Sequence, residues 1–307
     1  MATSQTALTF LQDAARRGER TALIVLTAVE GGAARGVGTL MAVSEAGPWC
    51  GSLSGGCTEA ALAGEARRVI ANGRAESLRV GAGSPLIDIR LPCGSAIDLL
   101  ILPQPDGTAV AGALALLASR VPVCLEAGHD GALRARSASP ADGTEPCPGH
   151  FAVRIDPQLR LVIAGHGEEV QALTRQARAW GAAVLVLTPD EHLAGEPDTI
   201  LLKSQTAEVD PALDPWSAMV FLFHDHDWEV PLLTRALAQP FLWIGAMGSR
   251  ATHARRIAAL AAAGVTETAA APIHGPIGLI PSARDPETLA LSVLAEVVSA
   301  YKQRGFP

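Results

Sequence analysis

Residues 159–190, LRLVIAGHGEEVQALTRQARAWGAAVLVLTPD, decide the fold of the second half of this chain. An apolar run predicts a buried strand, a glycine turn follows it, and an amphipathic pattern then predicts a helix. A second apolar strand ends in LVLTPD. Parallel strands need a crossover connection of this kind, so the stretch is predicted to be the opening βαβ unit of a parallel sheet.

The same alternation continues towards the end of the chain. Two more strands are predicted at 218–223 and 240–246, and helical patterns occur at 229–238, 251–264 and 286–303. The second half is therefore predicted to be a Rossmann-like parallel-sheet domain.

The first half is organised differently, in short β-rich runs broken by glycines. These runs lie at 21–29, 36–43, 86–91 and 96–102. One helix interrupts them, predicted for residues 58–71 with Asn72-Gly73 as its stop. Further strand-like runs between Val121 and Ile155 flank a Pro- and Gly-rich piece at 139–150, which predicts an exposed loop.

The chain length of 307 residues exceeds what one hydrophobic core usually supports. We place a domain boundary near Asp156-Pro157, where the pattern changes from short strands to alternating strands and helices. The predicted fold class is α/β, with an N-terminal β-rich α/β domain at 1–156 followed by a C-terminal Rossmann-like parallel-sheet domain at 157–307.

The composition excludes several classes of function. A formal net charge of -7 and a pI near 5.6 leave no basic face for nucleic acid. The longest apolar stretches, such as residues 109–118, are far shorter than the roughly 18 to 20 residues of a membrane-spanning helix. The first residues lack a signal-peptide pattern, so the cytoplasm is expected. The five cysteines form neither a disulfide framework nor a CxxC zinc pattern and are predicted to be free thiols.

A glycine turn at a strand end predicts an anion site in the second half. Gly165 and Gly167 match the first two glycines of a nucleotide-binding turn, where backbone N–H groups approach a phosphate. Glu168 and Glu169 place negative charge at the same turn, and the expected ribose-binding acid after the second strand is absent. A tight turn without a nucleotide is the competing interpretation.

Three polar residues, His224, Asp225 and His226, directly follow a strand, where open α/β sheets present ligands. Imidazole and carboxylate groups could coordinate a metal or hydrogen-bond a polar ligand. In an extended stretch the two histidines would point to opposite faces, so we favour ligand contact or helix capping over a metal.

Two further loops carry residues suited to an anion. Gly248, Ser249 and Arg250 lie between a strand and a helix, with simple capping by Ser249 as the alternative. His274 and Arg284 lie in a long Gly- and Pro-rich loop before the last helix, and such loops in compact domains are usually functional.

The stretch SGGCTEAAL, residues 54–62, is the most unusual in the first half. Gly55 and Gly56 lead to Cys57 at the start of a predicted helix, where the helix dipole favours a thiolate. A thiolate can bind a soft metal or accept sulfur. The alternative is a small buried residue that packs the helix start. Cys93, beside a turn proline and glycine, is a weaker candidate.

The order of these segments resembles that of the XdhC/CoxI family of xanthine dehydrogenase accessory proteins across nearly the whole chain. The most specific stretches are FHDHD, IGAMGSR and IHGPIGLIPSARDPETLALSVLAE, and SGGCTEAAL and LPCGSAIDLLI agree with them. The chain departs from the family pattern at the Rossmann turn, where Glu168 stands at a position usually held by histidine.

The resemblance implies a maturation chaperone without turnover of its own. Such a protein binds the molybdenum cofactor (molybdopterin), protects it, supports its sulfuration by a cysteine desulfurase, and inserts it into the apo xanthine dehydrogenase molybdenum subunit. Arg35, Arg250 and Arg284 are then candidate donors to the pterin phosphate, and Cys57 is the candidate neighbour of molybdenum or sulfur. A homodimer is left open.

Two other functions stay open at this point. An NAD(P)-dependent oxidoreductase suits the Rossmann pattern, although Tyr301 is the single tyrosine and Lys203 and Lys302 are the only lysines, which excludes a short-chain dehydrogenase. A metal-binding trafficking protein would use residues 224–226 and Cys57.

Overall fold

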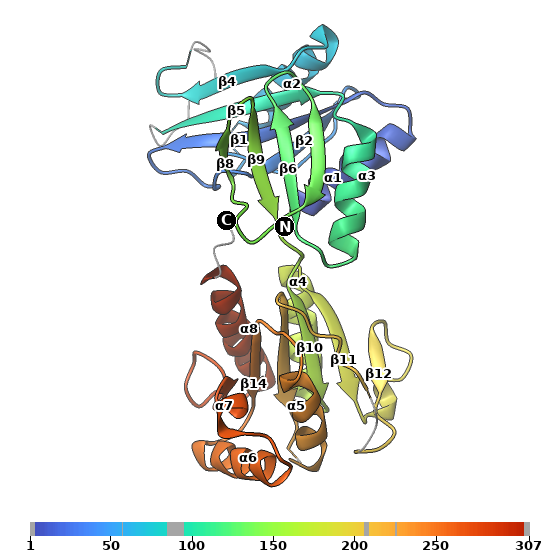
Figure 1. The fold of residues 1–307 in the computed structure, drawn as a ribbon, viewed down its shortest axis with the longest axis vertical. Helices are drawn as coiled ribbons and strands as arrows, with labels where there is room; N and C mark the ends of the chain where they lie inside the picture. The colour runs from blue at the N-terminus through green and yellow to red at the C-terminus, as the bar shows by residue number, and fades with distance from the viewer. Residues whose placement is uncertain (1–3, 57, 85–94, 206–208, 225, 304–307) are drawn as a thin grey trace. The chain divides into compact units, whose positions relative to one another are not determined.

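A computed structural model describes residues 4–56, 58–84, 95–205, 209–224 and 226–303. The chain separates into two compact units, with the division between Pro157 and Gln158 (Figure 1). Antiparallel sheets make up the first unit and a parallel sheet the second, which confirms the predicted α/β fold class. None of the helices in the described part of the chain has the length and hydropathy needed to span a bilayer.

The N-terminal unit is built on a five-stranded antiparallel sheet in the order β3-β2-β1-β5-β4. Its strands are β1 (Thr21–Glu30), β2 (Leu40–Ser44), β3 (Trp49–Cys50), β4 (Glu76–Gly81) and β5 (Ala96–Pro103). Side chains alternate between the two faces of the central strand β1, and both faces are buried. This double burial explains why its sequence, TALIVLTAV, is an almost continuous apolar run.

Helix α2 (Glu59–Asn72) covers one face of this sheet. Ala22, Ile24 and Leu26 of β1 pack there with the apolar side of the helix. The helix ends as predicted, because Gly73 adopts a left-handed φ of +68° and donates its backbone N–H to the Val69 carbonyl.

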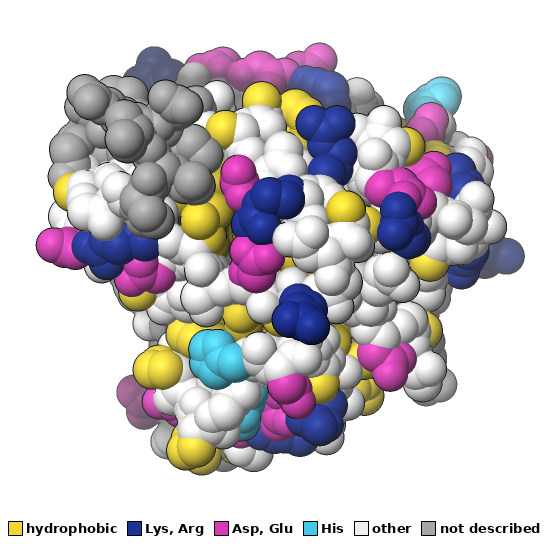
Figure 2. Space-filling model, turned by 90° about the horizontal axis from the view of Figure 1, so that it is seen from above, with side chains coloured by type: hydrophobic (Ala, Val, Ile, Leu, Met, Phe, Trp, Pro, Cys, Tyr) yellow, Lys and Arg dark blue, Asp and Glu magenta, His cyan; other side chains and the backbone are white. Residues whose placement is uncertain are grey.

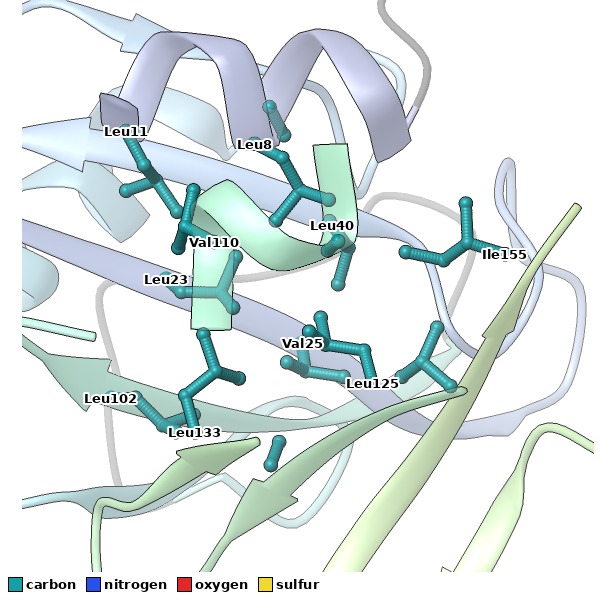
Figure 3. Packing of buried hydrophobic residues seen from close by; sticks show 14 of the residues in the cluster. Leu8, Leu11, Leu23, Val25, Leu40, Leu102, Val110, Leu125, Leu133 and Ile155 are labelled. Atoms are coloured by element: carbon teal, nitrogen blue, oxygen red, sulfur yellow. The ribbon is translucent and has the colours of Figure 1, made fainter. Parts of the chain in front are cut away.

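The opposite face packs against two helices and a second sheet. Leu23 and Val25 of β1 meet Leu8 of α1 (Ser4–Arg16), Val110 of α3 (Gly107–Ala118) and Leu125 of the second sheet (Figure 3). That sheet has the order β7-β6-β9-β8, formed by β6 (Val123–Gly128), β7 (Leu133–Ser137), β8 (Glu145–Cys147) and β9 (His150–Ile155). The main core of this unit therefore lies between the two sheets.

Several strand predictions for the first half need correction. The predicted loop at 139–150 contains the short strand β8, whose Pro146 is tolerated because β8 is an edge strand. Strands β3 and β4 lacked a recognisable pattern because most of their residues are not fully buried. The strand predicted at 86–91 lies outside the described residues.

The C-terminal unit is a six-stranded parallel sheet in the order β12-β11-β10-β13-β14-β15. Its strands are β10 (Arg160–Gly165), β11 (Ala183–Thr188), β12 (Thr199–Leu201), β13 (Ser217–Leu222), β14 (Trp243–Ala246) and β15 (Ile273–His274). Counted from β10, the order is that of the doubly wound Rossmann fold. The strand order reverses between β10 and β13, and ligands bind such folds at this switch point.

Helices cover both faces of the parallel sheet. The first and last helices, α4 (Glu168–Trp180) and α8 (Pro286–Gln303), pack on one face. The other face is covered by α5 (Glu229–Leu237) and α6 (Arg250–Ala262), with the short α7 (Glu267–Ala270) beside them. Predicted helices and strands of this half are all observed, since their apolar periodicity reflects burial within one sheet and its covering helices.

Gly165 ends β10 with no space for a side chain. A Cβ atom added there would lie 2.7 Å from the carbonyl oxygen of Leu222 and 2.8 Å from its carbonyl carbon, both backbone atoms. We expect Gly165→Ala to lower the free energy of unfolding by about 1 to 3 kcal/mol, because the two central strands must separate. Urea unfolding measures this change. Gly64→Ala is the control, since nothing lies within 4 Å of its added methyl and alanine favours the helix. Equal stability of the two variants would contradict the close approach.

Candidate functional site

Two glycine-rich loops meet at the end of the N-terminal sheet where β1 finishes and β5 begins. A Cβ atom added to Gly55 would lie 3.2 Å from the Cβ of Ala34, and one added to Gly31 would lie 3.4 Å from the Cβ of Ser95. We call residues 31–36, 51–56 and Ser95 the N-terminal loop cluster. The structure thus brings Arg35 near Gly55 and Gly56, which the sequence had singled out separately. Cys57 and Cys93 lie outside the described residues.

A buried carboxylate, that of Glu59, shapes this cluster. Its Oε1 accepts hydrogen bonds from Ser52 Oγ (2.8 Å), Leu53 N (2.9 Å) and Ser54 N (2.8 Å). Its Oε2 accepts from Ser54 Oγ (2.9 Å) and Thr58 N (3.2 Å). The side chain therefore gathers the loop before α2 around one negative charge.

Hydrogen bonding keeps that charge ionised despite burial. Burial alone would raise the pKa of Glu59, but the Ser54 N–H and the hydroxyls of Ser52 and Ser54 outweigh it and lower the pKa to about 2. Glu59 was not among the site residues predicted from the sequence. The sequence pattern that could have identified it is an acidic residue in the first helical turn, preceded by two serines. This pattern is related to helix capping.

Gly55 and Gly56 are exposed and have left-handed φ values of +83° and +112°. L-residues with side chains rarely adopt this conformation, so the turn requires glycine. Arg35 is also exposed, and its Nη1 donates to the neighbouring carbonyl of Ala34 (2.9 Å). The backbone of Gly55 and Gly56 and the guanidinium group of Arg35 are therefore exposed to solvent. The buried Glu59 holds the loop that carries the two glycines.

The switch point of the C-terminal sheet carries two histidines. His166, between Gly165 and Gly167, lies with its ring centroid 6.0 Å from that of His224, which follows β13. His224 Nε2 is 3.9 Å from Glu169 Oε1 in the first turn of α4. The predicted residues Gly165, Gly167 and His224 are thus together at this point. Because Glu169 lies at the helix N-terminus, it occupies the position at which an anionic phosphate would be stabilised.

The segment after β13 turns rather than continuing as a strand. Residues His226–Trp228 form a 3-10 turn, η2, and the Trp228 ring stacks on Phe223 at 6.3 Å. His226 therefore belongs to a turn and does not continue the strand. Asp225 lies outside the described residues, as does the side chain of His226.

The turn between β14 and α6 is formed by Met247, Gly248 and Ser249. Ser249 caps α6 by accepting the Thr252 N–H on its Oγ (3.1 Å), as the alternative interpretation held. Gly248 has a φ of +132° and packs against Thr252, whose Cγ2 would lie 2.6 Å from an added Cβ. Arg250, the next residue, is exposed.

Polar contacts hold the long loop after β15 against α8. His274 Nδ1 lies 3.2 Å from Glu296 Oε1, and Glu296 Oε2 accepts the Gly278 N–H (2.6 Å). The buried Ser292 Oγ accepts the Ile280 N–H (2.7 Å). Arg284 is exposed near the end of this loop.

The distribution of charged side chains and of metal-ligating side chains limits which ligands these sites can bind. Acidic and basic side chains are intermixed over the face seen in Figure 2, which is unlike a nucleic-acid-binding surface. Among the residues that the structure describes, no group of three or more His, Cys, Asp or Glu side chains could hold a metal ion. Within the same residues, the exposed Arg250 and Arg284 have no ion-pair partner.

Comparison with known proteins agrees with the resemblance seen in the sequence. The family model described as the XdhC Rossmann domain matches residues 161–297, and the XdhC and CoxI family model matches residues 14–81. The chain is 37% identical over 300 residues to the Escherichia coli (strain K12) molybdenum cofactor insertion chaperone PaoD, covering 96% of this chain and 88% of PaoD. The chain belongs to the XdhC/CoxI family.

Two other similarities place this family member in context. The uncharacterized protein YqeB of Escherichia coli (strain K12) is 31% identical over 175 residues, which cover 53% of this chain and 32% of YqeB. A crystal structure described as a xanthine dehydrogenase from Bacillus halodurans matches with a TM-score of 0.76 at 21% identity, covering 97% of this chain and 96% of that chain. At this identity the match establishes a shared fold.

The ionised state of Glu59 gives a pH-dependent prediction. Since its pKa falls from 4.5 to about 2 on folding, it stabilises the fold above about pH 4.5, and this contribution is lost as the pH falls towards 2. We expect Glu59→Gln to cost about 2 to 3 kcal/mol at pH 7, because an amide cannot accept all five hydrogen bonds, and distinctly less at pH 3.

Urea unfolding at both pH values measures this difference. Glu65→Gln in the same helix is the control, because its exposed ion pair with Arg68 is worth at most about 1 kcal/mol. If Glu59→Gln lowers the free energy of unfolding by the same amount at pH 7 and pH 3, the shape of the side chain at residue 59 matters and its charge does not.

Proposed function

We propose that this protein binds the molybdenum cofactor and inserts it into an apo-molybdoenzyme. The observation that carries the proposal is the 37% identity, over 96% of the chain, to a protein named as a molybdenum cofactor insertion chaperone. The similarity covers residues of both units. No substrate turnover is part of the proposal.

The chemistry of the exposed loops supports a carrier of an anionic pterin. A pterin phosphate needs N–H and guanidinium donors, and charge-assisted hydrogen bonds are about twice as strong as neutral ones. Arg35 supplies such a donor in the N-terminal unit, beside the exposed turn of Gly55 and Gly56. Arg250 and Arg284 supply them in the C-terminal unit.

The finer proposals concern partners and sulfur. The client is an apo xanthine dehydrogenase molybdenum subunit or a related molybdoenzyme, and a cysteine desulfurase supplies the sulfido ligand while this protein holds the cofactor. Cys57 is the proposed neighbour of molybdenum or sulfur. These steps take place in the cytoplasm, and a homodimer is a compatible form of the carrier.

The Rossmann turn supports this carrier better than a dehydrogenase. A dinucleotide pyrophosphate requires uncrowded N–H groups at the first turn of α4. Here Glu168 and Glu169 occupy that turn, with Glu169 near His224. An NAD(P)-dependent oxidoreductase and a metal-trafficking protein are therefore treated as competing outcomes of the experiment below.

Anaerobic incubation with released molybdopterin tests the function. We expect the pterin to co-elute with the protein in gel filtration, detected by fluorescence after oxidation. Arg250→Ala and Arg284→Ala should each raise Kd about ten-fold, because a lost charge-assisted hydrogen bond costs roughly 1.5 to 3 kcal/mol. Arg134→Ala, which removes an exposed arginine of β7, should leave Kd unchanged.

Four results would contradict the proposal or its assignment of residues. Failure of the pterin to co-elute removes the central claim. Bound NAD in the purified protein favours the oxidoreductase, and stoichiometric zinc or copper in elemental analysis favours metal trafficking. Wild-type affinity of both arginine variants would show that neither arginine side chain contributes to pterin binding.

A second experiment identifies the functional thiol. We expect Cys57→Ser to keep the thermal midpoint and to abolish maturation of the client dehydrogenase, measured as its sulfido-dependent activity. Cys124→Ala is the control, because Cys124 is buried in β6 and burial raises the pKa of its thiol, which disfavours thiolate chemistry. Normal maturation with Cys57→Ser, together with failure of Cys93→Ser, would move the chemistry to residue 93.

A further inference from the structure

A fully buried ion pair joins α5 to α6 beneath the C-terminal site. Glu229, the first residue of α5, and Arg256 are 0% and 2% exposed. Arg256 Nε donates to Glu229 Oε2 (2.8 Å) and Arg256 Nη2 donates to Glu229 Oε1 (3.0 Å). Nη2 also donates to the carbonyl oxygen of Met247 (2.7 Å). One guanidinium therefore holds a helix start and a loop together.

Stability alone does not account for this pair. Removing two charges from water costs several kcal/mol for each ion, and apolar residues of similar volume often replace buried pairs with no loss of stability. The surroundings are apolar, since α5, α6 and the sheet pack there through residues such as Leu232, Leu233 and Leu260. The reason for the pair is better sought in the segments that it orients.

Each residue of the pair adjoins one of the two polar segments at the carboxyl edge of the sheet. Glu229 directly follows η2, whose Trp228 stacks on Phe223 beside His224. Arg256 fixes the carbonyl of Met247, the residue before Gly248, while the Met247 N–H donates to the carbonyl oxygen of Phe221 (2.9 Å).

The two segments extend from β13 and β14, which are neighbouring parallel strands. The ion pair between Glu229 and Arg256 links these segments beyond the strand ends, so it helps to set the distance between them. A small change in the position of a binding group weakens a ligand contact strongly, because hydrogen bonds lose strength steeply with distance and angle.

We propose that Glu229 and Arg256 are positioning residues that hold the turn η2 (His226–Trp228) and the segment 247–250 in the arrangement that binds the ligand. The inference rests on the proposed function for the identity of that ligand. The pair touches no ligand itself and acts through the carbonyl of Met247 and the start of α5.

The experiment compares single and double replacements in the full-length protein. Glu229→Leu and Arg256→Met each leave one buried charge unpaired, and we expect each to lower the thermal midpoint by about 10 °C. The double variant removes both charges and should recover the wild-type midpoint. It should nevertheless bind molybdopterin at least ten-fold more weakly, and its amides at 247–250 should exchange hydrogen faster than those of wild type without any ligand present.

Arg256→Lys is the conservative variant. It retains the positive charge but loses the guanidinium group, whose two nitrogens donate to the two carboxylate oxygens of Glu229. It should bind more weakly than wild type and more tightly than the double variant. The exposed pair Arg68 and Glu76 in the N-terminal unit is the control, and its double replacement with Met and Leu should change neither Kd nor exchange at 247–250.

Different results separate the two proposals. Absence of molybdopterin binding by wild type would overturn the proposed function, and hydrogen exchange would still test the positioning role. A stable double variant with wild-type exchange at 247–250 would overturn the inference. A double variant as unstable as the single variants would also overturn it, because the pair would then be a structural element.

Discussion

Burial of both faces of a central strand is the constraint on which each unit depends. In β1 the even-numbered residues from Ala22 to Leu26 face α2, and the odd-numbered Leu23 and Val25 face the second sheet. In β10 the same alternation sends Leu161 and Ile163 towards α4 and α8, and Val162 and Ala164 towards α5 and α6. Because neither face can meet solvent, polar groups are confined to the strand ends, and the loops at these ends carry the candidate sites.

Those loops are held by buried charges as well as by apolar packing. Glu59 is a single carboxylate surrounded by hydrogen-bond donors, so its charge is satisfied without a cation. Glu229 and Arg256 pair with one another, and Arg256 also binds a backbone carbonyl. A buried charge is costly unless it is paired or hydrogen-bonded, so each such group restricts its loop to a small set of conformations.

The two loop regions differ in the ligand chemistry they offer. The N-terminal loop cluster exposes Gly55, Gly56 and the guanidinium group of Arg35, while its one described carboxylate, that of Glu59, is buried and occupied by donors of the loop. The Rossmann turn instead carries Glu168 and Glu169 at the N-terminus of α4, where they stabilise the helix dipole themselves. This turn therefore differs from the phosphate-binding turn of dinucleotide-binding proteins with this fold.

The sequence by itself determined the fold class and the main strands and helices of the second half, because apolar periodicity and glycine turns are local properties of the chain. Its motifs separately carried the resemblance to the XdhC/CoxI family. The short elements β12, α7 and β15 were not predicted. The sequence also brought out Gly165, Ser249 and His224 as residues at strand ends. It did not reveal β8, since Pro146 argues against a strand unless its position at the sheet edge is known. Only the tertiary structure decided the burial and the partners of Glu59 and Arg256. A charged residue in an amphipathic helix is normally solvated, and its burial and partners depend on which elements pack against it, which the local sequence does not specify.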